Sequence, residues 1–253
     1  MQRAFSLTNN RGMTIRGTQE WYGSPHGTPV ILAHGMIATH NQPQIREVAK
    51  MLAQAGFVTF RFSATNNVGS SQGRLINFTV GGFVDDMRSV VEYALSESRH
   101  ATCDVVGYSL GGMVATIVAA DDARIKHVAV QAPTYDLKKE MERTTIFPPY
   151  RLLGWTLRYS HTLDRKFKLG FHFYEEGILY DMRQYVARLH APTLIAYGTR
   201  DKYLRHANFS QAFQRLGGRK KIVRIPGAGH TFRRQTHIVQ FADCVTNWFH
   251  DNE

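Results

Sequence analysis

The stretch DVVGYSLGGMVATIVAA, residues 104–120, changes from a strand pattern to a helix pattern at one serine, Ser109. A G-x-S-x-G motif at such a change is typical of a nucleophile elbow, a strained turn that raises a serine hydroxyl above a β-sheet. Gly107 and Gly111 would let the strand and the following helix approach each other closely. The stretch therefore predicts Ser109 as a nucleophile, with the backbone N–H of Leu110 as one oxyanion donor.

The rest of the chain alternates between strand and helix patterns. Apolar runs bounded by turn residues predict strands at 29–35, 57–63, 102–108, 126–132, 192–198 and 221–227, and residues 10–22 predict earlier antiparallel strands. Most runs are continuous rather than alternating, which is typical of parallel strands buried on both faces. Helical periodicity covers 44–55, 83–97, 110–122, 206–218 and 231–251. The alternation predicts an α/β fold with helices on both faces of a mostly parallel sheet.

One segment interrupts this alternation. Residues 136–185 contain no clear strand pattern, yet they hold 10 of the 29 aromatic residues in the chain. Insertions of this length in a compact domain are usually lids or binding loops. The sequence thus predicts a core of residues 1–135 and 186–253, with 136–185 as a helical cap. The candidate substrate-pocket residues in the cap are Phe147, Trp155, Tyr159 and Phe171. The alternative is a small helical subdomain with a core of its own.

Two further polar residues follow predicted strands and complete a possible triad with the serine. Asp201 comes shortly after the strand 192–198, and His230 follows the strand 221–227. Because the carboxyl ends of parallel strands meet at one edge of a sheet, we expect these side chains to converge on Ser109. His230 would accept the serine proton, and Asp201 would orient the imidazole. Asp136, after the strand 126–132, is the alternative acid.

The loop after the strand 29–35 is expected to supply the second oxyanion donor. In this loop Gly35 permits a bend, and the backbone N–H of Met36 is the candidate donor. His34 is expected to support the loop rather than to take part in the reaction. The histidines show no spacing typical of a metal site, and no nucleotide-binding motif is present, so no metal or cofactor is expected.

These residues carry a family resemblance. The motifs LAHGM, GYSLGG, GTRD and GAGHTF occur in this order, and together they resemble the α/β-hydrolase fold family over essentially the whole chain. The segment FRFSATNNVGSSQG, residues 60–73, is similar to a segment of cinnamoyl and feruloyl esterases and of related monoacylglycerol-lipase-like hydrolases. Ser63 stands where that group has Asp, and Asn67 stands where it has Gly. The resemblance implies an eight-stranded sheet, a cap inserted between the sixth and seventh strands, and hydrolysis through an acyl-enzyme.

Composition limits the setting in which the protein acts. No stretch approaches the length of a membrane span, no secretory signal is visible, and two cysteines form no disulfide framework, so a cytoplasmic protein is expected. The net charge is +11, and residues 202–242 contain nine Lys or Arg and no Asp or Glu. This run indicates either a solvated basic face or a field that attracts anionic small molecules. No recognised nucleic-acid-binding module accompanies it.

Three functions follow from these features. The first is a serine-dependent hydrolase of carboxylic esters. The second is a thioesterase or acyltransferase that acts on anionic acyl-coenzyme A or acyl-carrier substrates, which the basic run would attract. The third is a non-catalytic binder on a hydrolase scaffold, because fold alone does not determine function. The number of subunits stays open.

Overall fold

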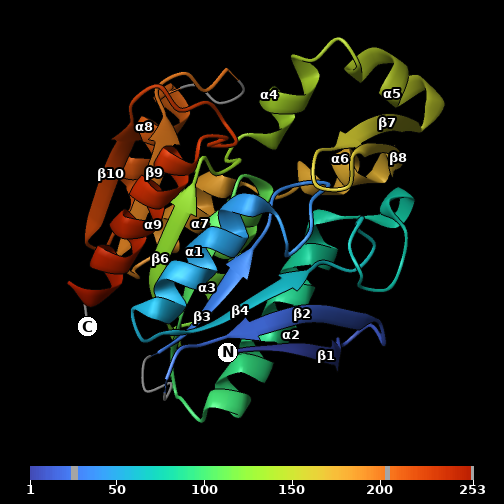
Figure 1. The fold of residues 1–253 in the computed structure, drawn as a ribbon. Coiled ribbons are helices and arrows are strands. Elements are labelled where there is room, and N and C mark those ends of the chain that lie inside the picture. The colour runs from blue at the N-terminus through green and yellow to red at the C-terminus, as the bar shows by residue number, and fades with distance from the viewer. Residues whose placement is uncertain (24–27, 203–205, 252–253) are drawn as a thin grey trace.

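A twisted eight-stranded sheet forms the centre of the molecule (Figure 1). The computed structural model describes residues 1–23, 28–202 and 206–251, with only the backbone at 206–210. The sheet has the order β1-β2-β4-β3-β5-β6-β9-β10. Its strands are β1 (Gln2–Thr8), β2 (Thr14–Glu20), β3 (Pro29–Ala33), β4 (Val58–Ser63), β5 (Cys103–Tyr108), β6 (Ile125–Gln131), β9 (Thr193–Gly198) and β10 (Lys220–Ile225). The six strands from β4 to β10 in this order are parallel, which confirms the predicted α/β class.

Helices cover both faces of the sheet, as the continuous apolar strands predict. One face carries α1 (Pro43–Gln54) and α9 (Gln235–His250), which pack against each other. The other face carries α2 (Val80–Ser98), α3 (Leu110–Asp121), α7 (Met182–Arg188) and α8 (His206–Arg215). Each layer encloses its own apolar core, so the central strands have no face in water. Burial of this kind supplies most of the favourable free energy of folding.

The antiparallel edge of the sheet differs from its prediction. The predicted range 10–22 contains one strand, β2, and the turn before it, whereas the first strand is β1. β1 is mostly exposed, and only Phe5 of its side chains is buried. An exposed edge strand needs no apolar run, so its sequence carries little signal. α9 likewise begins at Gln235 rather than at 231, after a turn in which Phe232 has a φ of 43°.

The segment 136–185 is not purely helical, which corrects the expected helical cap. It contains α4 (Leu137–Glu142), α5 (Phe147–Leu153), α6 (His172–Gly177) and a β-hairpin of β7 (Trp155–Ser160) and β8 (Arg165–Gly170). Polar or charged residues alternate with apolar ones along most of the hairpin, so no continuous apolar run marks it. The expected boundary at 185 falls inside α7, which packs on α3 of the core.

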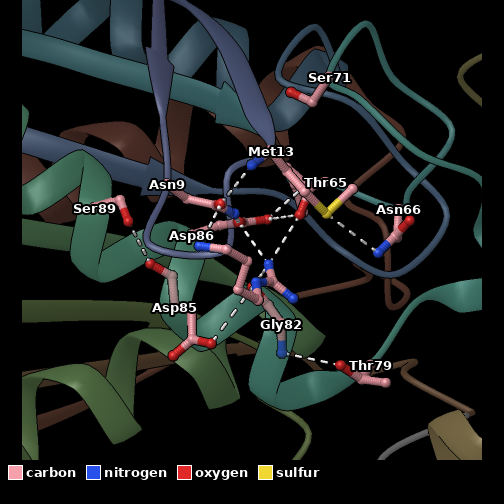
Figure 2. Close-up of polar contacts among 12 residues, drawn as sticks. Asn9, Met13, Thr65, Asn66, Ser71, Thr79, Gly82, Asp85, Asp86 and Ser89 are labelled. Carbon is pink, nitrogen blue, oxygen red and sulfur yellow. Dashed lines mark hydrogen bonds and ion pairs between the residues drawn. The ribbon is translucent and has the colours of Figure 1, made fainter.

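A buried carboxylate ties three distant segments together beside the sheet (Figure 2). Asp86 of α2 is fully buried, and it accepts hydrogen bonds from Asn9 Nδ2 (2.6 Å) and from the Thr65 N–H (2.6 Å). Arg11 Nη2 lies 2.9 Å from its Oδ1. Burial raises the pKa of Asp86, and the hydrogen bonds from Asn9 and Thr65 oppose that rise. The network holds the β1–β2 turn and the loop after β4 on α2.

Removing this carboxylate is expected to destabilise the fold strongly. Asp86→Ala would leave the donors of Asn9 and Thr65 without their acceptor and would remove the ion pair of Arg11, at a cost of about 3 kcal/mol in the free energy of unfolding. Asp85→Ala is the matched control, because the Asp85 carboxylate is partly exposed and lies 3.8 Å from Arg11 Nε. That control should lose less than about 1 kcal/mol. Urea unfolding of both variants measures the difference, and equal losses would contradict the argument.

Candidate active site

Ser109 occupies a sharp turn between β5 and α3. Its φ is 52°, a conformation that residues with side chains seldom adopt. A Cβ added at Gly107 would lie 2.3 Å from the carbonyl oxygen of Gly111, and one at Gly111 would lie 2.4 Å from that of Ala33. Only glycine fits at either position. The turn is also held by hydrogen bonds, since the Ser109 N–H donates to Gln131 O (2.9 Å).

The three residues predicted to converge lie within hydrogen-bond distance of one another. His230 Nε2 lies 3.0 Å from Ser109 Oγ, and His230 Nδ1 lies 2.8 Å from Asp201 Oδ2. Ser109 follows β5, Asp201 follows β9, and His230 follows β10, so all three project from the carboxyl edge of the sheet. The Asp201 side chain is 1% exposed and that of His230 is 14% exposed. The carboxylate is therefore shielded from water, while the imidazole remains accessible.

Side chains that sequence reasoning missed hold the histidine segment in place. Gln131 Nε2 donates to the carbonyl oxygen of His230 (3.3 Å), and Gln44 Nε2 donates to that of Thr231. The Tyr108 ring lies 5.4 Å from the His230 ring, centroid to centroid. A glutamine at the end of a strand or in the first turn of a helix has no distinctive pattern, so only the assembled fold reveals these contacts.

The loop after β3 has a well-defined conformation set by His34 and Gln42. His34 is fully buried, its Nδ1 lies 2.7 Å from Gly35 O, and its Nε2 lies 3.1 Å from the Ala64 N atom. Burial lowers the pKa of His34 to about 4, so the ring is neutral at pH 7, with Nδ1–H donating and Nε2 accepting. Gln42 Oε1 accepts from the Gly35 N–H (3.0 Å).

The backbone N–H groups of Met36 and Leu110 are both available for a ligand. Met36 follows Gly35 in this loop, and Leu110 opens α3 directly after the elbow. Neither N–H donates a hydrogen bond to any residue within the described ranges. A free amide at a helix N-terminus favours negative charge. This argument applies to Leu110, which opens α3, whereas Met36 lies in a loop.

Ser63 contacts the same loop at the position where the resembling group has Asp. Its Oγ lies 2.8 Å from His40 Nδ1 and accepts from the His40 N–H (3.2 Å). Burial, followed by the charge of Arg61, lowers the pKa of His40 to about 4. In the same segment Asn66, rather than Asn67, adopts a positive φ of 54°. The Ser63–His40 contact joins the end of β4 to the loop that carries Met36.

A second carboxyl lies near Asp201. Burial raises the pKa of Glu140 in α4 well above its ordinary value, and the charges of Asp136 and, to a lesser extent, Asp201 raise it further. Glu140 Oε1 is buried and has no hydrogen-bond partner among the described residues. Asp136, the alternative acid, caps α4 instead by accepting from the Lys139 N–H (3.1 Å). Of the two predicted acids, Asp201 is the one that contacts His230.

The four predicted pocket residues lie in different places. Phe147 and Phe171 pack against Tyr174, with ring centroids 4.8 and 5.3 Å away. Trp155 lines a groove between the hairpin and the loop that follows β4. Tyr159 is 44% exposed, and its hydroxyl donates to Asp164. The cap therefore has features of both predicted alternatives. Phe147 and Phe171 belong to an aromatic core within the cap, whereas Tyr159 is exposed to solvent.

The basic run 202–242 does not form one face beside the triad. Arg219 and Lys220 lie at the start of β10, at the edge of the sheet opposite to Ser109. Lys220 Nζ donates to Leu216 O (3.0 Å), and the Arg219 guanidinium lies over the Trp248 ring at 5.5 Å. Arg205 of the run lies outside the described residues. Part of the charge therefore has local structural partners.

Within residues 1–23, 28–202 and 206–251, no three or more His, Cys, Asp or Glu side chains gather closely enough to hold a metal ion. None of the helices in those ranges combines the length and the apolar character that crossing a membrane requires.

Solved structures share the fold at low sequence identity. Est1E from Butyrivibrio proteoclasticus, described with ferulic acid bound, matches with a TM-score of 0.86 and 18% identity over 98% of each chain. DcsB, described in complex with its substrate analogue, matches with a TM-score of 0.83 and 17% identity over all of each chain. The α/β hydrolase domain-containing protein 10 from mouse has a TM-score of 0.77 and 16% identity, over 99% of this chain and 100% of its own. No curated protein sequence matches the chain.

Two family profiles match the sequence itself, and each covers more than half of the chain. The profile described as serine aminopeptidase, S33, matches residues 24–175. The profile described as PhoPQ-activated pathogenicity-related protein matches residues 104–252. The first includes the elbow and the loop after β3, and the second includes the elbow, Asp201 and His230. With the sheet order and the shared fold, these matches establish that the chain belongs to the serine aminopeptidase S33 family of α/β-hydrolases.

Proposed function

We propose that this protein is a serine hydrolase that cleaves carboxylic esters through an acyl-enzyme intermediate. The observation that carries the proposal is the chain of contacts from Ser109 Oγ to His230 Nε2 (3.0 Å) and from His230 Nδ1 to Asp201 Oδ2 (2.8 Å). A serine hydroxyl is a weak nucleophile unless a neighbouring base takes its proton. The resemblance of the fold to Est1E, described with ferulic acid bound, is compatible with an acyl ester as the substrate.

In the proposed reaction, Ser109 Oγ attacks the acyl carbon while its proton passes to His230 Nε2. The resulting imidazolium is stabilised by Asp201 and donates the proton to the leaving alcohol as the ester bond breaks. Water then attacks the acyl-enzyme and gives its proton to His230. The carboxylic acid leaves, and Ser109 recovers its proton.

The oxyanion of each tetrahedral intermediate would accept hydrogen bonds from Met36 and Leu110. Such a donor is commonly worth about 10²–10³ in rate. The loop that carries Met36 depends on neutral His34, which links Gly35 to Ala64. His34 thus acts as a positioning residue, and the Ser63–His40 contact supports the same loop from outside.

Replacing the nucleophile tests the proposal directly. Ser109→Ala should lower kcat for p-nitrophenyl acyl esters by at least about 10⁴ and prevent labelling by a fluorophosphonate. A circular dichroism spectrum unchanged from that of the wild type would show that the variant is folded. Wild-type turnover in the folded variant would contradict the assignment, and it would favour a non-catalytic binder or a different nucleophile.

The two candidate acids can be separated by matched substitutions. Asp201→Asn should lower kcat by roughly 10²–10⁴, because the imidazole loses the group that orients it and stabilises its charge. Asp136→Asn should change kcat by less than about threefold, since an asparagine still caps a helix. Steady-state kinetics of both variants give the comparison. The reverse ranking would assign the role to Asp136.

The buried His34 predicts a loss of stability in acid. Its pKa is about 4 in the folded protein and 6.5 when unperturbed, so the unfolded chain binds the proton first as the pH falls. The contribution of neutral His34 to the free energy of unfolding is therefore complete above about pH 6.5. It is lost as the pH falls from there to about 4, and the loss reaches up to about 3 kcal/mol. Urea unfolding at several pH values across this range gives the free energy of unfolding as a function of pH. His34→Asn should reduce the slope of this dependence, whereas the exposed control His161→Asn should keep the wild-type slope. Parallel slopes for wild type and His34→Asn would contradict the argument.

A further inference from the structure

A groove of about 760 Å³ lies between the cap hairpin and the loop that follows β4. One wall comes from Asn67 to Ile76, a segment that includes the 3₁₀ turn η1 (Leu75–Asn77), and the other comes from β7 and β8. Its lining contains four cationic side chains, namely Arg74, Arg165, Lys166 and Lys168, and no carboxylate. None of the four forms an ion pair within the described part of the chain. Segments far apart in sequence thus create a concave site whose charged side chains are all positive.

Aromatic rings hold two of these cations at the groove wall. Lys168 Nζ lies 4.3 Å from the centroid of the Trp155 ring, and the Arg165 guanidinium lies 4.5 Å from that of Phe167. Trp155 and Phe167 both line the groove. Cation–π contacts restrict the long side chains and reduce the entropy lost when a ligand binds.

The opposite wall is held by hydrogen bonds to the body of the protein. The Asn66 N–H donates to Gln72 O (2.9 Å), and the Gln72 N–H donates to Thr14 O (2.8 Å). Ser71 Oγ donates to Ser63 O (2.6 Å). The same segment continues from Thr65, which is fixed on Asp86 (Figure 2). This wall is therefore formed before any ligand arrives.

The groove wall also lies behind the loop that carries Met36. A Cβ added at Gly69 would lie 2.3 Å from Ser63 Oγ and 3.5 Å from Thr39 Cγ2, so Gly69 packs closely on Ser63 and lies beside Thr39 of the Met36 loop. Ser63 in turn contacts His40 of that loop. This part of the groove wall thus borders the loop that carries the candidate oxyanion donor.

We propose that this groove binds the phosphate groups carried by the leaving group of the substrate, which makes phosphorylated thioesters or esters the substrate class. The inference rests on the proposed function and narrows it. Guanidinium groups match phosphate oxygens in geometry, and ammonium groups add charge without requiring one orientation. A cluster of like charges with no acid attracts an anion that has several negative charges. The volume exceeds what a single carboxylate would need.

Two thioesters with the same acyl group provide the test. Acyl-coenzyme A carries phosphates on its thiol, whereas acyl-pantetheine carries none. At low ionic strength, wild-type kcat/KM should be at least about tenfold higher for acyl-coenzyme A, and added salt should remove the difference. Arg165→Glu combined with Lys166→Glu should reduce this ratio about tenfold or more. Lys50→Glu combined with Lys126→Glu makes the same charge change on exposed residues outside the groove and should leave the ratio unchanged.

Further measurements separate this inference from the proposed function. Calorimetry measures the affinity of the Ser109→Ala variant for coenzyme A. This affinity should fall about tenfold when the two groove substitutions are added. Pyrophosphate should compete with coenzyme A for the groove. If pyrophosphate bound as tightly as coenzyme A, the groove would be a site for free anions, and the leaving-group assignment would be overturned. Turnover of acyl-pantetheine with no phosphate preference would overturn the inference and leave the hydrolase proposal intact. Binding of coenzyme A without turnover of any ester or thioester would do the reverse.

An anionic membrane surface is the alternative partner for these cationic side chains. Leu152, Leu153 and Leu157 are more than half exposed in the same part of the cap. Sedimentation with phosphatidylglycerol vesicles distinguishes the two occupants. Vesicle binding that the two groove substitutions abolish, with no change in the thioester ratio, would overturn the inference.

Discussion

The close contact of backbone with backbone at the elbow is the constraint on which the site depends. Gly107 and Gly111 permit the strand β5 to pass directly into α3, and the resulting turn holds Ser109 at a φ of 52°. Strain of this size persists only where the surrounding structure imposes it. Here the parallel strands β3 and β6 on either side of β5, together with the hydrogen bond from Ser109 to Gln131, supply that support. The hydroxyl is therefore presented at a fixed height above the sheet edge.

Buried polar groups do a second task, which is to fix loops that apolar packing cannot fix. His34 joins the loop after β3 to Ala64, and Asp86 joins the loop after β4 to α2. Each group loses its hydration on burial, and only hydrogen bonds of defined direction offset that cost in free energy. Each group therefore specifies a single loop conformation. His40 of the first loop contacts Ser63 at the end of β4, and Ser71 of the second loop donates to the Ser63 carbonyl oxygen. The candidate oxyanion donor and the wall of the cationic groove consequently form one connected unit.

The cap consists of a hairpin and short helices that are separate in sequence from the strand ends carrying Ser109, Asp201 and His230. Its aromatic cluster around Phe171 gives it internal order, while its hairpin turns charged residues towards a groove that the core loop completes. Residues on such insertions can vary without disturbing β5, β9 or β10, because the cap contributes no strand to the main sheet. The contacts of Ser109 with His230 and the lining of the groove therefore depend on different segments, and under the proposed function the groove would set the substrate preference without altering the triad.

The elbow, the α/β class and the positions of Ser109, Asp201 and His230 could be predicted from residue order, because local propensity and the end of each strand impose them. The edge strand β1, the hairpin β7–β8 and the contacts of Gln131 and Asp86 could not, because exposed strands and lone polar residues leave no periodic signal. The ranking of Asp201 over Asp136 also depends on the folded chain, since both follow strands and only distance to His230 separates them. Long-range packing brings together residues that are remote in sequence, and the groove between Arg74 and Lys168 exists for that reason alone.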